Sequence, residues 1–230
     1  TKAGKLMSCS AIDLFCGIGG LTKGLSLAGI NVVAGFDNDE TCKFAYEYNN
    51  KSIFVCKDVE QLSKQDLSNY YPQKDIRILV GCAPCQPFSR YSCRYRKNGR
   101  QDKKWKLLYS FLRLIKETEP EIVSMGNVPN LRNETIFHVF KNSLENLGYY
   151  VSYKIVFCPD YNVPQNRKRL VLLASKLGKI NLISPFIKKK YKTVRMAIGH
   201  LPSIQAGEKS KNDFLHQSCS LSKKNLERIR

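Results

Sequence analysis

The sequence lacks several features that define whole classes of protein. No apolar run approaches the roughly 20 residues that a membrane-spanning helix needs. Residues 1–10 show no apolar core of a secretory signal peptide, so we expect none. There is no internal repeat. The 230 residues are enough for one domain with a full hydrophobic core.

Histidine is scarce, and the cysteines show no disulfide spacing. With three histidines and no second pair beside Cys82 and Cys85, a zinc site lacks ligands, and we predict no metal. The nine cysteines are an odd number and suit a reducing cytoplasm. A thioredoxin-like redox pair stays open for Cys82 and Cys85 at this point, although Pro84 and residues 86–89 indicate a different motif.

Acidic residues are few. The chain has 19 aspartates and glutamates and 38 lysines and arginines, which gives a formal net charge of +19. Such an excess predicts a polyanionic partner. A solvated basic surface is the alternative, so charge alone does not establish nucleic-acid binding.

What the sequence does contain is an alternation of β-rich runs and amphipathic stretches. Strands are expected at residues 10–15, 32–36, 53–55, 76–80, 122–125, 149–157 and 170–174. Helices are expected at about 20–28, 40–48, 105–118 and 135–147, the second with Phe44 and Tyr48 on one face. This alternation predicts an α/β fold with a mostly parallel sheet and helices on both faces.

The pattern weakens after residue 175. We predict a cofactor-binding catalytic domain over residues 1–175 and a peripheral extension over 176–230. In a parallel sheet, ligands bind at the carboxyl ends of the strands. The loops after Phe15, Phe36, Val55, Val80 and Met125 therefore come first as candidates for the site.

The first of these loops is glycine-rich. Residues 13–20 read Asp-Leu-Phe-Cys-Gly-Ile-Gly-Gly, and Asp37 ends the next strand about 20 residues on. Glycines let a ligand approach the backbone, and a carboxylate there usually holds ribose hydroxyls. The glycine-rich loop and Asp37 together favour a cofactor that contains adenosine. A cap on the next helix by Asp37 or Asp39, or a nicotinamide enzyme, stays open on these loops alone.

The fourth loop narrows the choice of enzyme class. Residues 84–89 read Pro-Cys-Gln-Pro-Phe-Ser, and the chain continues with Asn127-Val128 and with Pro-Gln-Asn-Arg-Lys-Arg at 164–169. Together with residues 13–20, these motifs resemble those of the DNA cytosine-5 methyltransferase family. They occur in the same order along the chain as in that family. The resemblance covers residues 11–174 well and continues less specifically to residue 230. It implies a Rossmann-like methyltransferase fold and S-adenosyl-L-methionine as cofactor.

The resemblance implies a catalytic role for Cys85. A thiolate that adds to cytosine C6 makes C5 nucleophilic enough to take a methyl group. Nearby arginines should lower the pKa of this thiol. Arg167 and Arg169 would approach the flipped cytosine and its phosphates.

The resemblance also implies residues around the cofactor. Phe15 would pack on the adenine, Asp37 would hold the ribose hydroxyls, and Asp58 would accept from the adenine amino group. A core role for Phe15 and a helix cap by Asp58 are the alternatives. The full predicted set is Phe15, Gly17, Ile18, Gly19, Gly20, Asp37, Asn38, Asp58, Val59, Pro84 and Leu107.

The implied substrate is double-stranded DNA, from which the target base must be flipped out. Residues 90–106 hold eight basic residues, with aromatic residues interleaved, and suit a loop that contacts phosphates. The predicted DNA-binding residues are Gln86, Ser89, Arg90, Arg94, Arg96, Asn127 and Gln165.

One position departs from the family. Gly126 stands where the resemblance implies a glutamate that contacts cytosine N3 and its amino group. Glycine cannot supply a proton, and such groups are worth typically about 10²–10⁴ in rate. We therefore expect impaired catalysis.

Relatives of this kind carry a target-recognition region, and none is recognisable up to Arg230. A second polypeptide could supply it, as in a split enzyme. The alternatives are a non-catalytic DNA- or cofactor-binding subunit and a transfer-RNA cytosine-5 methyltransferase. The leading prediction is an enzyme of a bacterial restriction–modification system, cytoplasmic and associated with the nucleoid when bound to DNA.

Overall fold

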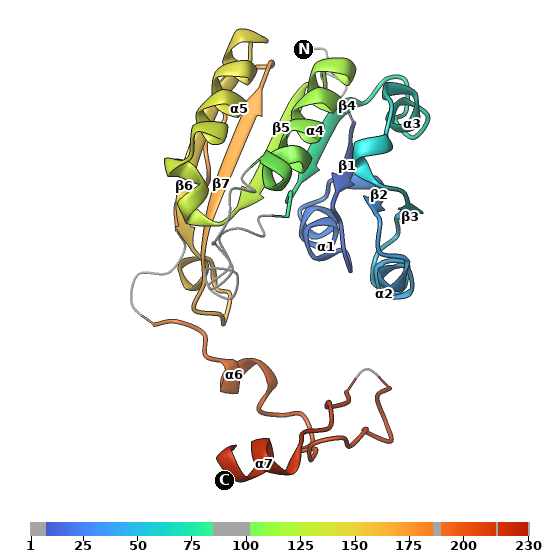
Figure 1. Ribbon diagram of the computed structural model, residues 1–230, viewed down its shortest axis with the longest axis vertical. Coiled ribbons are helices and arrows are strands. Elements are labelled where there is room, and N and C mark those ends of the chain that lie inside the picture. Colours follow the sequence, from blue (N-terminus) through green and yellow to red (C-terminus); the bar gives the residue numbers. More distant parts are fainter. Residues whose placement is uncertain (1–7, 85–101, 186–189, 215, 230) are drawn as a thin grey trace, which may run out of the picture.

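A seven-stranded sheet forms the centre of the protein (Figure 1). The computed structural model describes residues 8–84, 102–185, 190–214 and 216–229. The strand order is β3-β2-β1-β4-β5-β7-β6. The strands are β1 (Cys9–Leu14), β2 (Asn31–Asp37), β3 (Ile53–Cys56), β4 (Ile76–Gly81), β5 (Ile122–Asn127), β6 (Tyr150–Phe157) and β7 (Lys168–Ser175).

The first five strands are parallel, and the last two are not. β1 pairs in parallel with β2 and β4, and β3 and β5 extend this arrangement on either side. β7 is antiparallel to both β5 and β6. The predicted mostly parallel sheet is confirmed. β7 enters between β5 and β6, so its start lies beside the end of β5.

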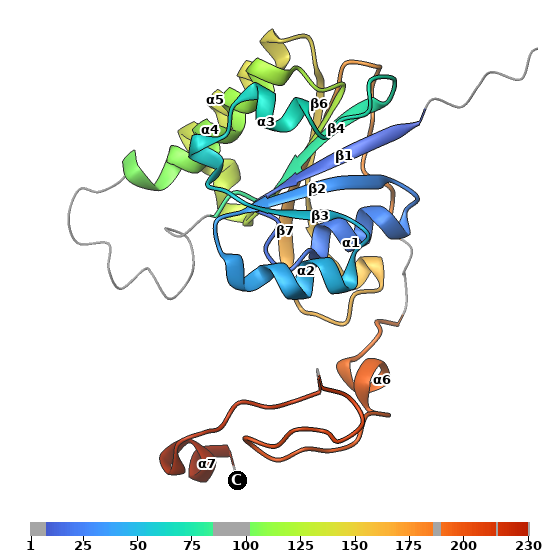
Figure 2. The same cartoon turned by 90° about the vertical axis from the view of Figure 1, so that its right-hand side faces the viewer.

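Helices cover both faces of the sheet, as predicted (Figure 2). On one side lie α1 (Gly20–Leu27) and α2 (Lys43–Asn49), and on the other lie α3 (Lys64–Ser68), α4 (Asp102–Thr118) and α5 (Thr135–Asn146). Short 3-10 turns are η1 (Glu40–Cys42), η2 (Val59–Gln61), η5 (Pro129–Asn133) and η6 (Cys158–Tyr161). Among the described residues, no helix is long and apolar enough to cross a membrane.

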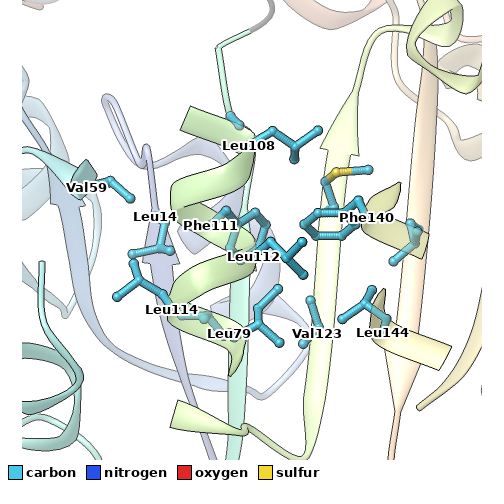
Figure 3. Packing of buried hydrophobic residues seen from close by; sticks show 14 of the residues in the cluster. Leu14, Val59, Leu79, Leu108, Phe111, Leu112, Leu114, Val123, Phe140 and Leu144 are labelled. Atoms are coloured by element: carbon cyan, nitrogen blue, oxygen red, sulfur yellow. The ribbon is translucent and has the colours of Figure 1, made fainter. Parts of the chain in front are cut away.

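The largest part of the core lies between α4, α5 and the sheet. Phe111 and Leu114 of α4 are fully buried, because their helical spacing points both at the strands. Figure 3 shows this face of α4 against Leu79 and Val123 of the sheet and Phe140 of α5. The rings of Phe111 and Phe140 lie 5.7 Å apart. This packing fixes α4 behind the ends of β1, β4 and β5.

The stretch predicted as one helix at 40–48 is divided into η1 and α2. Phe44 and Tyr48 share a face as predicted, with stacked rings, and both side chains are exposed. Tyr46 is the buried residue of α2. The Tyr46 hydroxyl bonds the Ser52 hydroxyl at 2.8 Å, so a polar tip lets this tyrosine be buried.

The described residues of 176–229 contribute little to the core, and the division of the chain into a catalytic domain and a peripheral extension stays a prediction. The helices there are α6 (Val194–Ile198) and α7 (Lys223–Ile229), and neither buries a residue. Figure 1 shows this segment beyond the sheet domain. Phe214 contacts Phe44 and Tyr48, with ring centroids 6.3 and 5.7 Å apart.

The α4 packing predicts a strong effect of Phe111→Ala. Removal of a fully buried ring leaves a cavity, so we expect a loss of about 3–5 kcal/mol in the free energy of unfolding. Urea denaturation measures this loss. Tyr109→Ala on the exposed side of the same helix is the control and should cost under about 1 kcal/mol. Similar losses in both variants would contradict the packing described.

Candidate active site

The carboxyl ends of the parallel strands meet at one edge of the sheet. In the register of the strands, Leu14 of β1 lies opposite Gly81 of β4, and Gly81 lies opposite Met125 of β5. Asp37 at the end of β2 lies opposite Cys56. The chain order reverses between β1 and β4, which makes this the switch point where α/β sheets bind ligands. The loops that the sequence singled out therefore belong to one region.

The antiparallel β7 adds a further segment to this edge. Leu170 pairs with Asn127 at the end of β5, so Arg169 and Arg167 lie just beyond it. The Arg167 side chain is exposed, and Arg169 is half-buried with its guanidinium donating to the Lys168 carbonyl at 2.8 Å. Both arginines thus stand beside the fourth and fifth loops. Gln165 nearby is also exposed.

The first loop has an unusual backbone. Phe15 has φ 58°, a left-handed conformation that non-glycine residues rarely adopt, and Gly17 follows with φ 50°. Phe15 is half-buried against the core. The loop turns sharply away from β1, and Ile18 at its tip is 66% exposed. Strain of this kind concentrates at functional sites.

Asp37 links the first and second loops. One carboxylate oxygen accepts the Gly17 N–H at 2.8 Å, and the other accepts the Asp39 N–H at 3.0 Å. Asp39 caps η1 by accepting the Thr41 N–H at 3.0 Å, so of the two candidates for a cap, Asp39 takes that role. A carboxylate has about four lone-pair sites, so Asp37 retains acceptor capacity for a ligand.

The third loop lies against the start of α4. Asp58 caps η2 by accepting the Glu60 N–H at 2.9 Å, as the alternative reading of this residue predicted. Glu60 forms an ion pair with Lys106. Val59 is buried, and Leu107 packs on the same core. The ion pair places η2 beside the start of α4, and an adenine pocket made by Asp58, Val59 and Leu107 stays a prediction.

Asp13 lies buried behind the first loop. Its carboxylate accepts the Thr22 hydroxyl at 2.8 Å, and that hydroxyl also lies 3.1 Å from the Tyr46 hydroxyl. Burial raises the pKa of Asp13 to about 7, against the opposing effect of the Thr22 hydrogen bonds. Burial also raises the pKa of the neighbouring Cys16 thiol far above its usual range.

The fourth and fifth loops touch through Asn127 and Cys82. The Asn127 amide donates to the Ala83 carbonyl at 3.2 Å and its oxygen accepts the Val128 N–H at 2.8 Å. Asn127 is buried, so its DNA contact stays a prediction and its observed partner is the backbone one residue before Pro84. A Cβ on Gly126 would lie 2.8 Å from the Cys82 sulfur.

Cys82 is not set up as a second nucleophile. Cys82 is exposed, and partial desolvation by the surrounding protein raises the pKa of its thiol to about 11, with Asp13 adding to the rise and Arg167 opposing it. A thiol of this kind stays protonated at neutral pH.

Several predicted residues lie outside the described ranges: Cys85, Gln86, Ser89, Arg90, Arg94 and Arg96. Asn38 directly follows β2, and Pro84 lies shortly after β4, so both are at the same edge of the sheet.

Comparison with known proteins identifies the family. A model of C-5 cytosine-specific DNA methylases matches residues 9–229. The chain belongs to this family. It is 48% identical over 224 residues to the Type II methylase M.HgiDII of Herpetosiphon aurantiacus, over 96% of this chain and 62% of that protein. It is 33% identical to the Type II methyltransferase M.MthTI of Methanothermobacter thermautotrophicus, over 85% of this chain and 58% of that protein.

Solved structures agree on the fold. A proposed DNA modification methyltransferase encoded within an E. coli prophage matches 90% of this chain and 59% of its own, at 25% identity and a TM-score of 0.73. The S. pombe Dnmt2 methyltransferase matches 76% of this chain and 52% of its own, at 21% identity and a TM-score of 0.61. The chain thus spans about three-fifths of the length of M.HgiDII. The predicted family and Rossmann-like methyltransferase fold are confirmed.

Sequence reasoning missed two features of the site. Thr22 and Tyr46 bond each other in a buried polar cluster with Asp13, and a polar residue inside an apolar helix face was the only signal for Thr22. Cys82 attracted attention only as half of a C-x-x-C pair. Its contact with Gly126 joins two strands far apart in the chain, and no local pattern predicts it.

The raised pKa of Asp13 predicts a pH-dependent stability. Between about pH 4 and pH 7 the native carboxyl keeps a proton that the unfolded chain has released, so stability falls as pH rises through this range. The isosteric Asp13→Asn variant binds no proton there. Relative to that variant, the Tm of the original chain should fall by at least about 4 °C from pH 5 to pH 8. Scanning calorimetry without cofactor measures this; parallel Tm curves would refute it.

Proposed function

We propose that this chain is the cofactor-binding catalytic part of a DNA cytosine-5 methyltransferase. It would transfer a methyl group from S-adenosylmethionine to C5 of cytosine in double-stranded DNA, through a covalent adduct at Cys85. The observation that carries the proposal is the convergence of the first, second, fourth and fifth loops at one edge of the sheet. Membership of the family supports the same chemistry.

The residues at the switch point suit the cofactor. A Cβ built on Gly17 or Gly20 would meet nothing within 4 Å, so the loop leaves open space above its backbone. Asp37 would hold the ribose hydroxyls with its remaining lone pairs, and Asp58, Val59 and Leu107 would surround the adenine. When bound, S-adenosylmethionine supplies an electrophilic methyl group on a positively charged sulfur.

The covalent step belongs to Cys85. Its thiolate would form a bond to cytosine C6, which makes C5 nucleophilic and lets a C5–methyl bond form as the methyl–sulfur bond breaks. Loss of the C5 proton to solvent and cleavage of the bond between sulfur and C6 would then release 5-methylcytosine and the free thiolate. Pro84, beside Cys85, would shape the loop against the cofactor.

DNA would lie along the same edge. Arg167 and Arg169 stand beyond the end of β5, where they would meet the flipped cytosine and its phosphates. The net charge of +19 supports a polyanionic partner. A region that reads the DNA sequence would come from a further segment or from a second polypeptide, and the complex would work in the bacterial cytoplasm at the nucleoid.

Gly126 favours a second candidate function. Without an acidic side chain at this position the ring nitrogen of cytosine lacks a proton donor, and the rate should fall by about 10²–10⁴. A chain that binds cofactor and DNA but turns over slowly would act as a binding subunit. Measured turnover separates the two functions.

Cofactor binding should depend on Asp37. Asp37→Asn removes a charged acceptor from the ribose site, so the Kd for S-adenosylmethionine should rise about 10- to 100-fold by calorimetry. Asp39→Asn is the matched control, because Asp39 caps η1 and should leave the Kd within about twofold. An unchanged Kd in Asp37→Asn would place the cofactor elsewhere.

The covalent chemistry can be tested by trapping. DNA that contains 5-fluorocytosine should form an adduct with the chain in the presence of S-adenosylmethionine, because fluorine at C5 cannot leave as a proton does. Denaturing electrophoresis would show the shifted band, which Cys85→Ala should abolish. Adduct formation that survives Cys85→Ala would rule out Cys85 as the nucleophile.

A further inference from the structure

One arginine ties the third loop to helix α4. Arg113 lies in α4, and its guanidinium donates to the Leu62 carbonyl at 2.8 Å and to the Glu60 carbonyl at 3.3 Å. The Val59 carbonyl lies 3.5 Å from the same nitrogen. These acceptors come 51 to 54 residues before Arg113 in the sequence, so the contact depends on the fold of the domain.

The η2 turn has few hydrogen bonds of its own. The Asp58 carbonyl accepts the Gln61 N–H at 2.9 Å. The Val59 carbonyl accepts the Leu62 N–H at the longer distance of 3.4 Å. Hydrogen-bond geometry in a 3-10 turn is poorer than in an α-helix. A guanidinium can stabilise such a turn, because its planar group carries several donors that reach neighbouring carbonyls together.

Arg113 has a second partner that fixes its direction. Its other terminal nitrogen donates to both Glu117 carboxylate oxygens, at 2.9 and 3.1 Å. Lys106 of α4 also reaches η2 through its ion pair with Glu60, but the Lys106 side chain is 64% exposed. Exposed ion pairs contribute little stability. The contacts of Arg113 with the carbonyls are therefore the stronger tie between α4 and η2.

The turn that Arg113 holds also orients the predicted adenine acid. The Asp58 carboxylate accepts the Glu60 N–H at 2.9 Å, and the carbonyl of the same Glu60 accepts from Arg113. Val59 packs in the core beside α4 (Figure 3). The backbone of Glu60 thus connects the guanidinium with the carboxylate, and a shift of this backbone would move the Asp58 side chain with it.

We propose that Arg113 is a positioning residue for the adenine half of the cofactor, and that it acts through η2 on Asp58 and Val59. The inference rests on the proposed function for the place of the adenosine. Because α4 comes after the segment that holds Cys85, the same contact joins the adenine pocket to the helix that follows the fourth loop.

Calorimetric binding tests the proposal. Arg113→Met keeps an unbranched side chain without donors, so the Kd for S-adenosylmethionine should rise at least about fivefold. The Kd for 5′-methylthioadenosine, which lacks the amino-acid end, should rise by the same factor. Arg113→Lys keeps one charged donor group and should show a smaller rise of about two- to threefold, and it carries the test if Arg113→Met does not fold. Glu117→Gln should leave both Kd values within about twofold, because the carbonyl contacts remain.

Arg77→Met is the matched control for a purely structural effect. Arg77 donates to the Thr118 and Glu119 carbonyls at the end of α4, at 2.9 and 2.8 Å. It also forms an ion pair with Glu121, but it lies near the start of β4, at the opposite edge of the sheet. Both methionine variants should lower the Tm by about 2–4 °C, and only Arg113→Met should weaken binding.

Three results would overturn the inference while the proposed function stands. They are unchanged Kd values in the Arg113 variants, an equal rise in Arg77→Met, and a rise for S-adenosylmethionine without one for 5′-methylthioadenosine. The last result would place the effect at the methionine end.

Hydrogen exchange separates these results from failure of the proposed function. Without cofactor, the amides of residues 59–62 should exchange at least about fivefold faster in Arg113→Met, and at the original rate in Arg77→Met. If the original chain binds neither ligand, the proposed function fails, and faster exchange in Arg113→Met alone still supports the hold of Arg113 on η2. Unchanged exchange in Arg113→Met would overturn that hold.

Discussion

The site depends on the parallel pairing of β1 with β4. This pairing sets Leu14 opposite Gly81, so the segments that follow β1 and β4 leave the sheet at the same level. The helices that come next along the chain, α1 and α4, lie on opposite faces of the sheet, which makes this edge a switch point. Everything proposed for this protein, from adenosine binding to attack on a base, uses this edge of the sheet.

The antiparallel strand β7 brings a further segment to this edge of the sheet. A sixth parallel strand at this position would end at the same edge and carry the chain away from it. β7 instead begins there, so residues 164–169 come before the strand and stay beside β5. The arrangement brings Arg167 close enough to Cys82 to influence its thiol, although the two residues belong to distant parts of the sequence.

Four polar side chains behind the first loop form hydrogen bonds with one another. Thr22, Tyr46 and Ser52 share hydroxyl hydrogen bonds, and Asp13 joins them through Thr22. Such networks hold a loop in one conformation because an unmade hydrogen bond in a buried place is costly. The turn at Phe15 lies beside this cluster, because Asp13 comes two residues before it and Cys16, which follows it, packs on Tyr46.

The sequence by itself determined the family and the alternation of strands and helices, and its motifs supplied the predicted residues of the site. Local patterns were sufficient for this, because glycine turns, apolar periodicity and short motifs act over a few residues. The same patterns did not identify Tyr46 as the buried residue of α2, because burial of a tyrosine depends on hydroxyl groups elsewhere in the chain that satisfy its own. Only the tertiary structure decided the antiparallel order of β7, the cap roles of Asp39 and Asp58, and the contact of Cys82 with Gly126. The caps are local contacts two residues apart, where the structure chose between alternatives that the sequence had left open. The order of β7 and the approach of Cys82 to Gly126 depend on which strands become neighbours, and strand neighbours are set by packing of the whole domain and not by adjacency along the chain.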